Sequence, residues 1–194
     1  DAARDIGFWF HMGRWSLDPA LWREQVHLML PGGRLIVARA FGRRDKVDGP
    51  AGPCMDFTCK APGKSWRLAY HGPGRETSRA ELSDAPIPEG ERALLDFDIA
   101  FDSDSAVWDF GAAAGGEDWA SAHYEQTGRA HGRISFAGET FEIDGFGWRD
   151  HSRGPRDLSN HLGHCWIHGA FEGGRSFALC TIRQRQGPGF AKAM

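Results

Sequence analysis

Long apolar runs are missing from this sequence, and the longest ones present are far too short to cross a bilayer as a helix. No membrane span is therefore expected. A large excess of one charge sign is missing as well, because the net charge is −3 and the isoelectric point is about 6.3. This near balance gives no electrostatic reason to expect a nucleic acid or an anionic membrane as a partner.

Cysteine is also scarce. The four cysteines, Cys54, Cys59, Cys165 and Cys180, contain no Cys-x-x-Cys pair, and a disulfide framework is not expected in a chain of 194 residues. Reduced thiols make the cytoplasm the expected compartment. The chain starts Asp-Ala-Ala-Arg-Asp, without an initiator methionine or a signal-peptide pattern, which indicates a fragment or a trimmed chain.

Aromatic residues, by contrast, are abundant: the chain has eight tryptophans and thirteen phenylalanines, and 41% of its residues are hydrophobic. Such a composition is typical of a packed core and of β-strands. Short alternating segments separated by glycine-rich turns predict an antiparallel all-β protein. The expected elements are a strand at 6–15, a short helix that Asp18 caps with Pro19 at its first position, a half-buried strand at 90–102, and hairpins across 31–33, 62–64, 137–138 and 172–174.

A long connection, acidic at first and then rich in glycine and alanine, separates two groups of predicted strands. Long loops are uncommon inside a compact domain, so this connection is the predicted boundary. The expected organisation is an N-terminal domain at 1–102, a linker at 103–118 and a C-terminal domain at 119–194.

Groups that transfer protons or bind anions are densest between Asp144 and Cys180. Asp150 and His151 form a carboxylate–imidazole pair suited to general acid–base catalysis, and Arg153 follows them closely. If the segment is extended, alternation places Trp148 and Asp150 on one side and His151 on the other. The alternative is a structural ion-pair network in which nearby arginines neutralise the aspartates.

His164, Trp166 and His168 alternate in the sequence and therefore share one face of a predicted strand. This face either lines a ligand cavity or points to solvent. His161, His164 and His168 have a spacing that would suit a zinc site on a helix, but the segment that contains them is predicted to be a strand. No metal and no cofactor are therefore expected.

Two motifs resemble the AttH-like and carotenoid hydratase-like proteins, the double-lipocalin branch of the calycins. They are Gly147-Trp-Arg-Asp-His-Ser-Arg-Gly-Pro-Arg-Asp157 and His164-Cys-Trp-Ile-His-Gly169. Trp9-Phe-His11, Asp18-Pro19, Trp22, Trp108-Asp109 and His123-Tyr-Glu-Gln-Thr-Gly-Arg129 are similar as well, so the resemblance spans most of the chain.

The resemblance implies two lipocalin-like antiparallel β-barrels side by side, with an apolar small-molecule cavity. Since the related proteins are longer, the second barrel is expected to be incomplete in a chain ending at Met194. The hydratases carry Asp-His-Asn-Trp-Gly where this chain has Asp150-His151-Ser152-Arg153-Gly154, and their later Tyr-x-Asp pair has no match. Asp150 and His151 thus carry over, whereas the proton-donating aspartate of the hydratases does not.

The sequence thus predicts a protein that binds an apolar small molecule, such as an isoprenoid, a polyketide or a steroid-like compound. It is expected to catalyse hydration, dehydration or isomerisation without a cofactor. His151 is the expected proton-transfer residue and Asp150 its partner; the predicted substrate-binding residues are Trp148, Arg153, His164, Trp166 and His168. The alternative is a non-catalytic carrier or sensor of the same kind of ligand.

Overall fold

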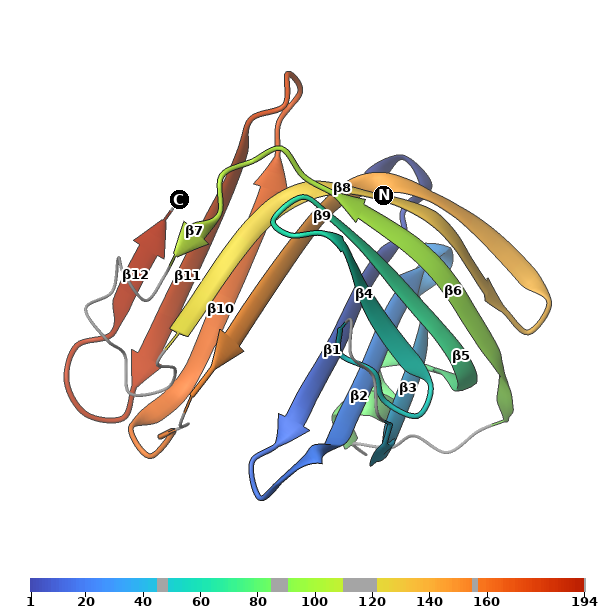
Figure 1. The fold of residues 1–194 in the computed structure, drawn as a ribbon, viewed down its shortest axis with the longest axis horizontal. Helices are drawn as coiled ribbons and strands as arrows, with labels where there is room; N and C mark the ends of the chain where they lie inside the picture. Colours follow the sequence, from blue (N-terminus) through green and yellow to red (C-terminus); the bar gives the residue numbers. More distant parts are fainter. Residues whose placement is uncertain (45–48, 85–90, 110–121, 155–156, 194) are drawn as a thin grey trace. The chain divides into compact units, whose positions relative to one another are not determined.

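The structure is a computed structural model that describes residues 1–44, 49–84, 91–109, 122–154 and 157–193. Strands dominate it (Figure 1), and the all-β prediction is confirmed. The strands are β1 (Gly7–Trp15), β2 (Asp18–Leu30), β3 (Arg34–Arg43), β4 (Met55–Ala61), β5 (Ser65–Thr77), β6 (Arg92–Asp102), β7 (Trp108–Asp109), β8 (Ala122–Phe136), β9 (Glu139–Arg153), β10 (His161–Ala170), β11 (Ser176–Gln184) and β12 (Phe190–Ala193). The helices are α1 (Arg79–Asp84) and the 3₁₀ turns Ala2–Arg4 and Pro31–Gly33.

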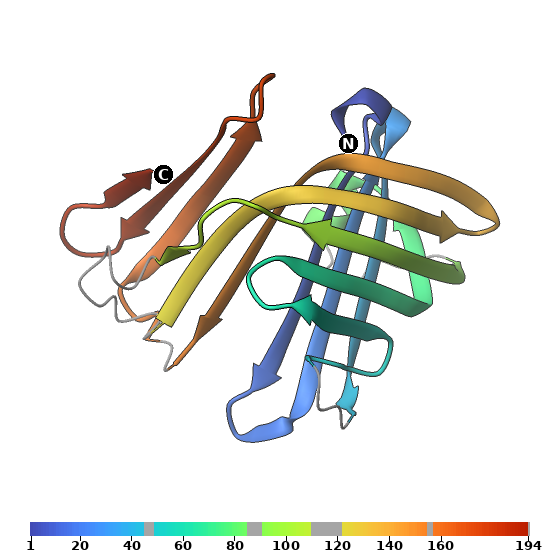
Figure 2. The ribbon, with the colours of Figure 1, turned by 45° about the horizontal axis from the view of Figure 1, so that its top comes forward.

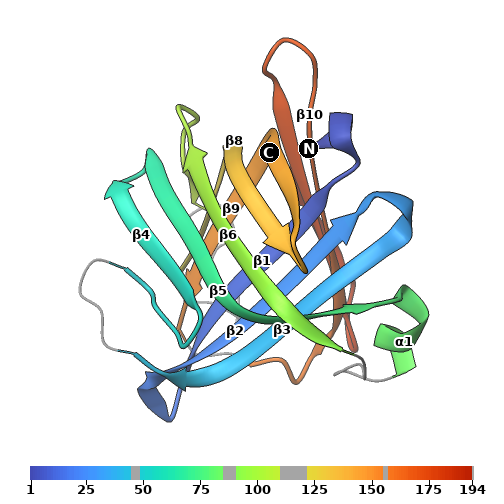
Figure 3. The same ribbon diagram turned by 90° about the vertical axis from the view of Figure 1, so that its right-hand side faces the viewer.

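The strands form two sheets. Nine of them make one antiparallel sheet in the order β1-β2-β3-β5-β6-β8-β7, in which β4 also pairs with β5 and β9 with β8. Strands β1 to β6 curl into a half-barrel (Figure 3). The other sheet has the order β10-β11-β12. The half-barrel sheet therefore confirms the predicted barrel-like character of the fold.

The chain divides into two compact units. Unit 1 contains Asp1–Asp102 and Ala130–Gly145, and unit 2 contains Ser103–Arg129 and Phe146–Met194. This division differs from the predicted one, which assigned 130–145 to the C-terminal domain. The reason is that β8 and β9, each fifteen residues long and paired side by side (Figure 2), are both shared between the units. Much of the predicted linker, from residue 110 onward, lies outside the described residues.

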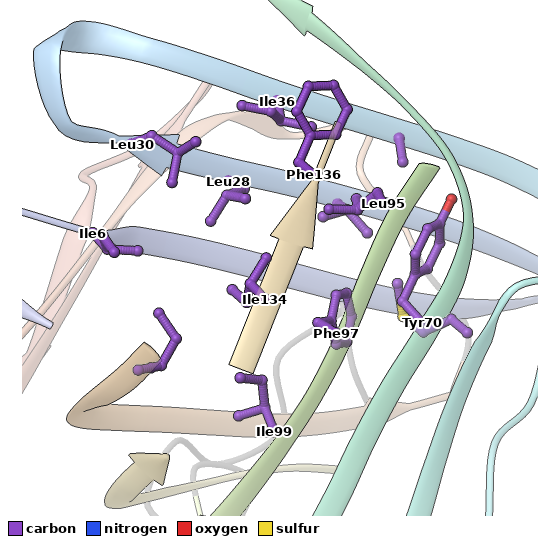
Figure 4. Close-up of a cluster of buried hydrophobic side chains, with 14 of the residues drawn as sticks. Ile6, Leu28, Leu30, Ile36, Tyr70, Leu95, Phe97, Ile99, Ile134 and Phe136 are labelled. Carbon is purple, nitrogen blue, oxygen red and sulfur yellow. The ribbon is translucent and has the colours of Figure 1, made fainter. Parts of the chain in front are cut away.

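Unit 1 is built around side chains that alternate inward along its strands (Figure 4). Leu95, Phe97 and Ile99 of β6 are at most 2% exposed, as the half-buried pattern at 90–102 predicts. The ring of Phe97 stacks on that of Phe10, with centroids 4.0 Å apart, and on that of Tyr70 at 5.5 Å. Apolar side chains thus fill the interior of the half-barrel, and their burial stabilises the unit.

The predicted hairpins are confirmed. β2 pairs with β3 from Leu30↔Arg34 onward, and β10 pairs with β11 across the turn at 172–174. Between β8 and β9, Ala137 and Gly138 have φ of 51° and 88°, the pattern of a two-residue turn whose twist suits a hairpin.

The short helix predicted at Asp18 is wrong, because these residues begin strand β2. Trp22, Val26 and Leu28 are buried at even-numbered positions, and this two-residue period continues the strand back to Asp18. Pro19 occupies the second position of the strand, near the end where a missing backbone N–H costs little. Burial of one strand face therefore outweighs the helix-capping signal.

One buried charge holds a loop in unit 1. Glu24 of β2 is 1% exposed, and its carboxylate accepts hydrogen bonds from the backbone N–H of Cys54 at 3.1 Å and of Met55 at 2.8 Å. Burial raises the pKa of Glu24, although these hydrogen bonds act in the opposite direction. The Glu24 carboxylate thus takes the place of a backbone carbonyl as the acceptor for N–H groups where β4 begins.

We expect Glu24→Ala to lower the free energy of unfolding by about 2 kcal/mol, because it leaves the buried N–H of Met55 and the partly buried N–H of Cys54 without an acceptor. Urea unfolding followed by tryptophan fluorescence measures this loss. Glu139→Ala is the matched control, since Glu139 is half exposed and contacts only the guanidinium of Arg34. Equal losses for the two variants would contradict a supporting role for Glu24.

Candidate functional site

The predicted site residues lie in unit 2, which contains residues 122–129 of β8 and residues 146–153 of its partner strand β9. Side chains alternate between the two faces of this pair. Arg149 and His151 both contact Tyr124, whereas Trp148 stacks on His168. The predicted alternation is therefore confirmed, and Asp150 falls on the Trp148 side, opposite to His151.

Four residues form what we name the arginine face: Tyr124, Gln126, Arg149 and His151. The Arg149 guanidinium donates a hydrogen bond from Nη2 to the Tyr124 hydroxyl oxygen at 2.9 Å, and its carbon lies 5.1 Å from the Tyr124 ring centre. The His151 ring is tilted against the Tyr124 ring, with centroids 5.3 Å apart. A phenol, a guanidinium and an imidazole thus meet on one face.

A buried amide holds Arg149 in this position. Gln126 is 1% exposed; its Nε2 donates to the Ser105 carbonyl oxygen at 2.9 Å, and its Oε1 accepts from Arg149 Nη1 at 3.3 Å. Because Ser105 receives the amide N–H, the amide oxygen must face the guanidinium. The guanidinium is therefore oriented toward Tyr124 by a side chain that has little freedom to turn.

His151 is exposed but packed against its neighbours. Partial burial lowers the pKa of His151 below its ordinary value, and the nearby positive charge of Arg149 lowers it further; Asp150 raises it and Arg153 lowers it by smaller amounts. The imidazole is consequently neutral at pH 7 and available as a base. Asp150 and Arg153 thus act on His151 electrostatically.

The opposite face, which we name the ring face, consists of His123, Trp148, His164, Trp166 and His168. Trp148 and His168 stack with centroids 4.4 Å apart and planes 15° from parallel. Trp166 stacks on His123 at 5.2 Å and meets His164 edge-on at 5.6 Å. The structure therefore brings together four of the predicted substrate-binding residues as alternating indole and imidazole rings.

Partial burial lowers the pKa of both His164 and His168, as it does for His151; the His161 charge lowers that of His164 further, whereas Asp150 raises that of His168. A histidine whose pKa is lower in the folded state than in the unfolded state binds fewer protons when folded. These histidines therefore do not reduce the free energy of unfolding above their pKa in the unfolded chain, about 6.5. The free energy of unfolding decreases as the pH falls toward their lower pKa values in the folded protein.

We expect the melting temperature to drop between pH 7.5 and pH 5.5, and differential scanning calorimetry measures the change. His168→Phe keeps a ring against Trp148 but removes one titrating group, so its drop should be smaller. Glu24, with a raised pKa, acts in the opposite direction in both proteins, so the comparison isolates the histidine contribution. An equal drop in both proteins would rule out His168 as a source of acid sensitivity.

A buried acid–base pair includes His123 of the ring face and is not among the predicted site residues. His123 Nε2 lies 2.7 Å from Glu125 Oε1, and both side chains are at most 1% exposed. The second carboxylate oxygen, Oε2, is buried and has no hydrogen-bond partner among the described residues. The signal that could have found this pair is the spacing of two residues, which places both side chains on one strand face.

Asp150 and Arg153 lie near the end of β9, where the sequence places them. The predicted arginine partner of Asp150 is not seen within the described part of the chain, where Arg149 binds Tyr124 and Gln126 instead. Arg156 lies outside the described residues. Asp150 and His151 are therefore neighbours in sequence but not a hydrogen-bonded pair.

Strand β10 carries His164, Trp166 and His168, so the strand prediction is confirmed and the helical spacing of a zinc site does not apply. His161 Nε2 lies 3.1 Å from His164 Nδ1. Within the described ranges, no group of three or more His, Cys, Asp or Glu side chains could hold a metal ion. Cys165 pairs in register with Thr181, and no disulfide joins the four cysteines, all of which lie in the described ranges.

Fold and site together define an all-β protein with a half-barrel sheet and a histidine- and tryptophan-rich face. The chain belongs to the family described as Domain of unknown function (DUF7064), whose family model matches residues 1–193. No curated protein and no solved structure matches the chain. Among the described residues, no helix is long and apolar enough to cross a membrane.

Proposed function

We propose that this protein binds an apolar small molecule, such as an isoprenoid, a polyketide or a steroid-like compound, and catalyses a cofactor-free proton transfer on it. The observation that carries the proposal is the ring face. Stacked indole and imidazole rings offer flat apolar surface, and the ring nitrogens supply a few polar groups for orientation. The resemblance to AttH-like and carotenoid hydratase-like proteins supports the same class of ligand.

Proton transfer is proposed for His151, the titratable group best suited to it. His151 lies on the arginine face, opposite to the ring face, so the proposal requires a ligand that contacts both faces of the β8–β9 pair. Its pKa is lowered by partial burial and by Arg149, so the neutral base dominates at pH 7. Asp150 and Arg153 tune this base through their charges. No disulfide joins the four cysteines, all of which are among the described residues, and this supports the reducing cytoplasm as the compartment in which the protein works.

A carrier or sensor of the same ligand is the second candidate. It is favoured by the ring face, whose stacked rings offer an apolar binding surface on the side of the β8–β9 pair opposite to His151. Against it, Asp150 and His151 are exposed and do not form the buried, mutually paired set that a purely structural network requires. An enzyme is therefore the better supported of the two.

Native mass spectrometry of the purified protein tests ligand binding directly. We expect an added mass that organic solvent removes and that Trp148→Ala and Trp166→Ala reduce, because each removes half of a ring stack. Trp9→Ala is the matched control, since Trp9 is 46% exposed in unit 1 and outside the ring face. If Trp9→Ala lost the ligand while the other two variants kept it, the ring face would not be the binding site.

A further inference from the structure

We infer that the substrate is a carbonyl compound and that Tyr124 is the hydrogen-bond donor to its oxygen, with His151 as the base that removes the proton beside the carbonyl. This inference rests on the proposed function, since it names the substrate class for the same proton transfer. The reaction that fits is the shift of a double bond in an unsaturated ketone, which needs a base and an oxyanion donor together.

The donor role follows from how the Tyr124 hydroxyl is bonded. Its oxygen accepts a hydrogen bond from Arg149 Nη2 at 2.9 Å, so its own proton must point elsewhere. Among the described residues no acceptor for that proton is found. The positive guanidinium, fixed by the buried Gln126, makes the phenol a stronger donor and stabilises negative charge that develops on a bound oxygen.

The base role follows from the position of His151. Its ring lies 5.3 Å from the Tyr124 ring on the same face, so one small molecule can contact both groups. The opposite face of β9 holds Trp148 and Asp150, and neither replaces His151 as a base beside the phenol. The donor and the base thus come from two neighbouring strands.

The proposed steps balance without a cofactor. The His151 imidazole takes the proton from the carbon next to the carbonyl, and the C–H electron pair forms the new double bond of a dienolate. The carbonyl oxygen gains the negative charge and accepts the hydrogen bond from Tyr124. The imidazolium then returns the proton to the far carbon of the dienolate, and the electrons restore the carbonyl.

Hydration of an isolated alkene fits this face less well. Protonating an unactivated double bond requires a strong acid, whereas His151 is neutral at pH 7 and has Arg149 beside it. Removing a proton next to a carbonyl requires only a neutral base and a donor for the oxygen. The arginine face therefore favours carbonyl substrates within the proposed apolar class.

The test compares two probes that have the same rings. 2-Naphthol mimics the enol form of a carbonyl compound, and 2-methylnaphthalene has a methyl group in place of the hydroxyl. Equilibrium dialysis should show that the wild-type protein binds 2-naphthol about ten-fold more tightly, the effect of one good hydrogen bond. Tyr124→Phe should remove this preference while still binding both probes, because it keeps the ring and loses only the hydroxyl.

Tyr70→Phe is the matched control, since Tyr70 is the only other tyrosine in the chain and its hydroxyl bonds to the Pro73 carbonyl in unit 1. It should keep the full preference. Equal binding of both probes to the wild-type protein, or a preference that survives in Tyr124→Phe, would overturn the carbonyl inference alone. If neither probe bound the wild-type protein, binding of an apolar molecule would be refuted as well.

A hydrogen–deuterium exchange assay tests the role of His151 as the base directly. In D₂O, the wild-type protein should speed deuterium incorporation into the methyl group of 2-acetonaphthone, measured by NMR, and both Tyr124→Phe and His151→Gln should slow it. Circular dichroism spectra that match the wild type establish that the variants are folded. Wild-type exchange rates in both folded variants would overturn the assignment of donor and base.

Discussion

His151→Ala is expected to lower kcat roughly 100-fold or more on the ligand that co-purifies with the protein, which is the usual loss when a general acid–base is removed. The reason is that the neutral His151 imidazole stands beside the Tyr124 phenol and the Arg149 guanidinium. Steady-state kinetics at pH 7.5 measures the effect. KM should change much less than kcat, because Tyr124 and Arg149 on the same face are left intact.

The pH profile gives an independent check of the same group. Since the pKa of His151 is lowered, the active neutral form should persist below pH 6.5 and be lost only at more acidic pH. His131→Ala is the control, because His131 is half exposed on the part of β8 that belongs to unit 1. Wild-type turnover in a folded His151→Ala protein would rule out His151 as the proton-transfer residue.

Phe97→Ala is expected to lower the free energy of unfolding by about 3–5 kcal/mol, the usual loss when a buried phenylalanine leaves a cavity. Phe97 is 2% exposed and its ring stacks against both Phe10 and Tyr70. These three rings come from β6, β1 and β5, so the cavity would open where three strands meet. Urea unfolding followed by circular dichroism measures the loss.

Leu94→Ala on the same strand is the matched control. Leu94 is 56% exposed, so its removal should cost only about 0.5 kcal/mol. Similar losses for the two variants would mean that the Phe97 ring does not fill the half-barrel.

The alternation of apolar and polar residues made most strands predictable. Leu95, Phe97 and Ile99 are buried as their spacing indicates, because a strand with one face in a core must place every second side chain inward. The same alternation predicted that His151 and Asp150 lie on opposite faces of one strand. The prediction failed at Asp18, where the local capping signal favoured a helix although the alternating burial of Trp22, Val26 and Leu28 continues the strand.

Helix α1 was missed although the sequence carries a signal for it. Ser78 and Glu81 form a capping box: the Glu81 carboxylate accepts from the Ser78 N–H at 2.8 Å, and the Ser78 hydroxyl accepts from the Glu81 N–H at 3.2 Å. This helix is only six residues long, too short for a hydrophobic period to appear.

The residues that contact the site residues from other strands could not be predicted from the sequence. Tyr124 lies 27 positions before His151, and only the pairing of β8 with β9 brings their rings together. His123 and Trp166 are likewise joined through tertiary contacts alone. Local spacing indicates which side chains share a strand face, but it does not indicate which strands are neighbours.

The sharing of β8 and β9 between the two units has a consequence for how the protein is made. During synthesis, residues 1–102 emerge before 130–145, so unit 1 cannot complete its sheet until 130–145 have left the ribosome. Residues 103–129 emerge in between and pair in part with one another, as β7 does with β8, but unit 2 also needs the residues that begin at Phe146. Each unit is thus built from two separate stretches of chain, so no single cut in the gene separates one from the other.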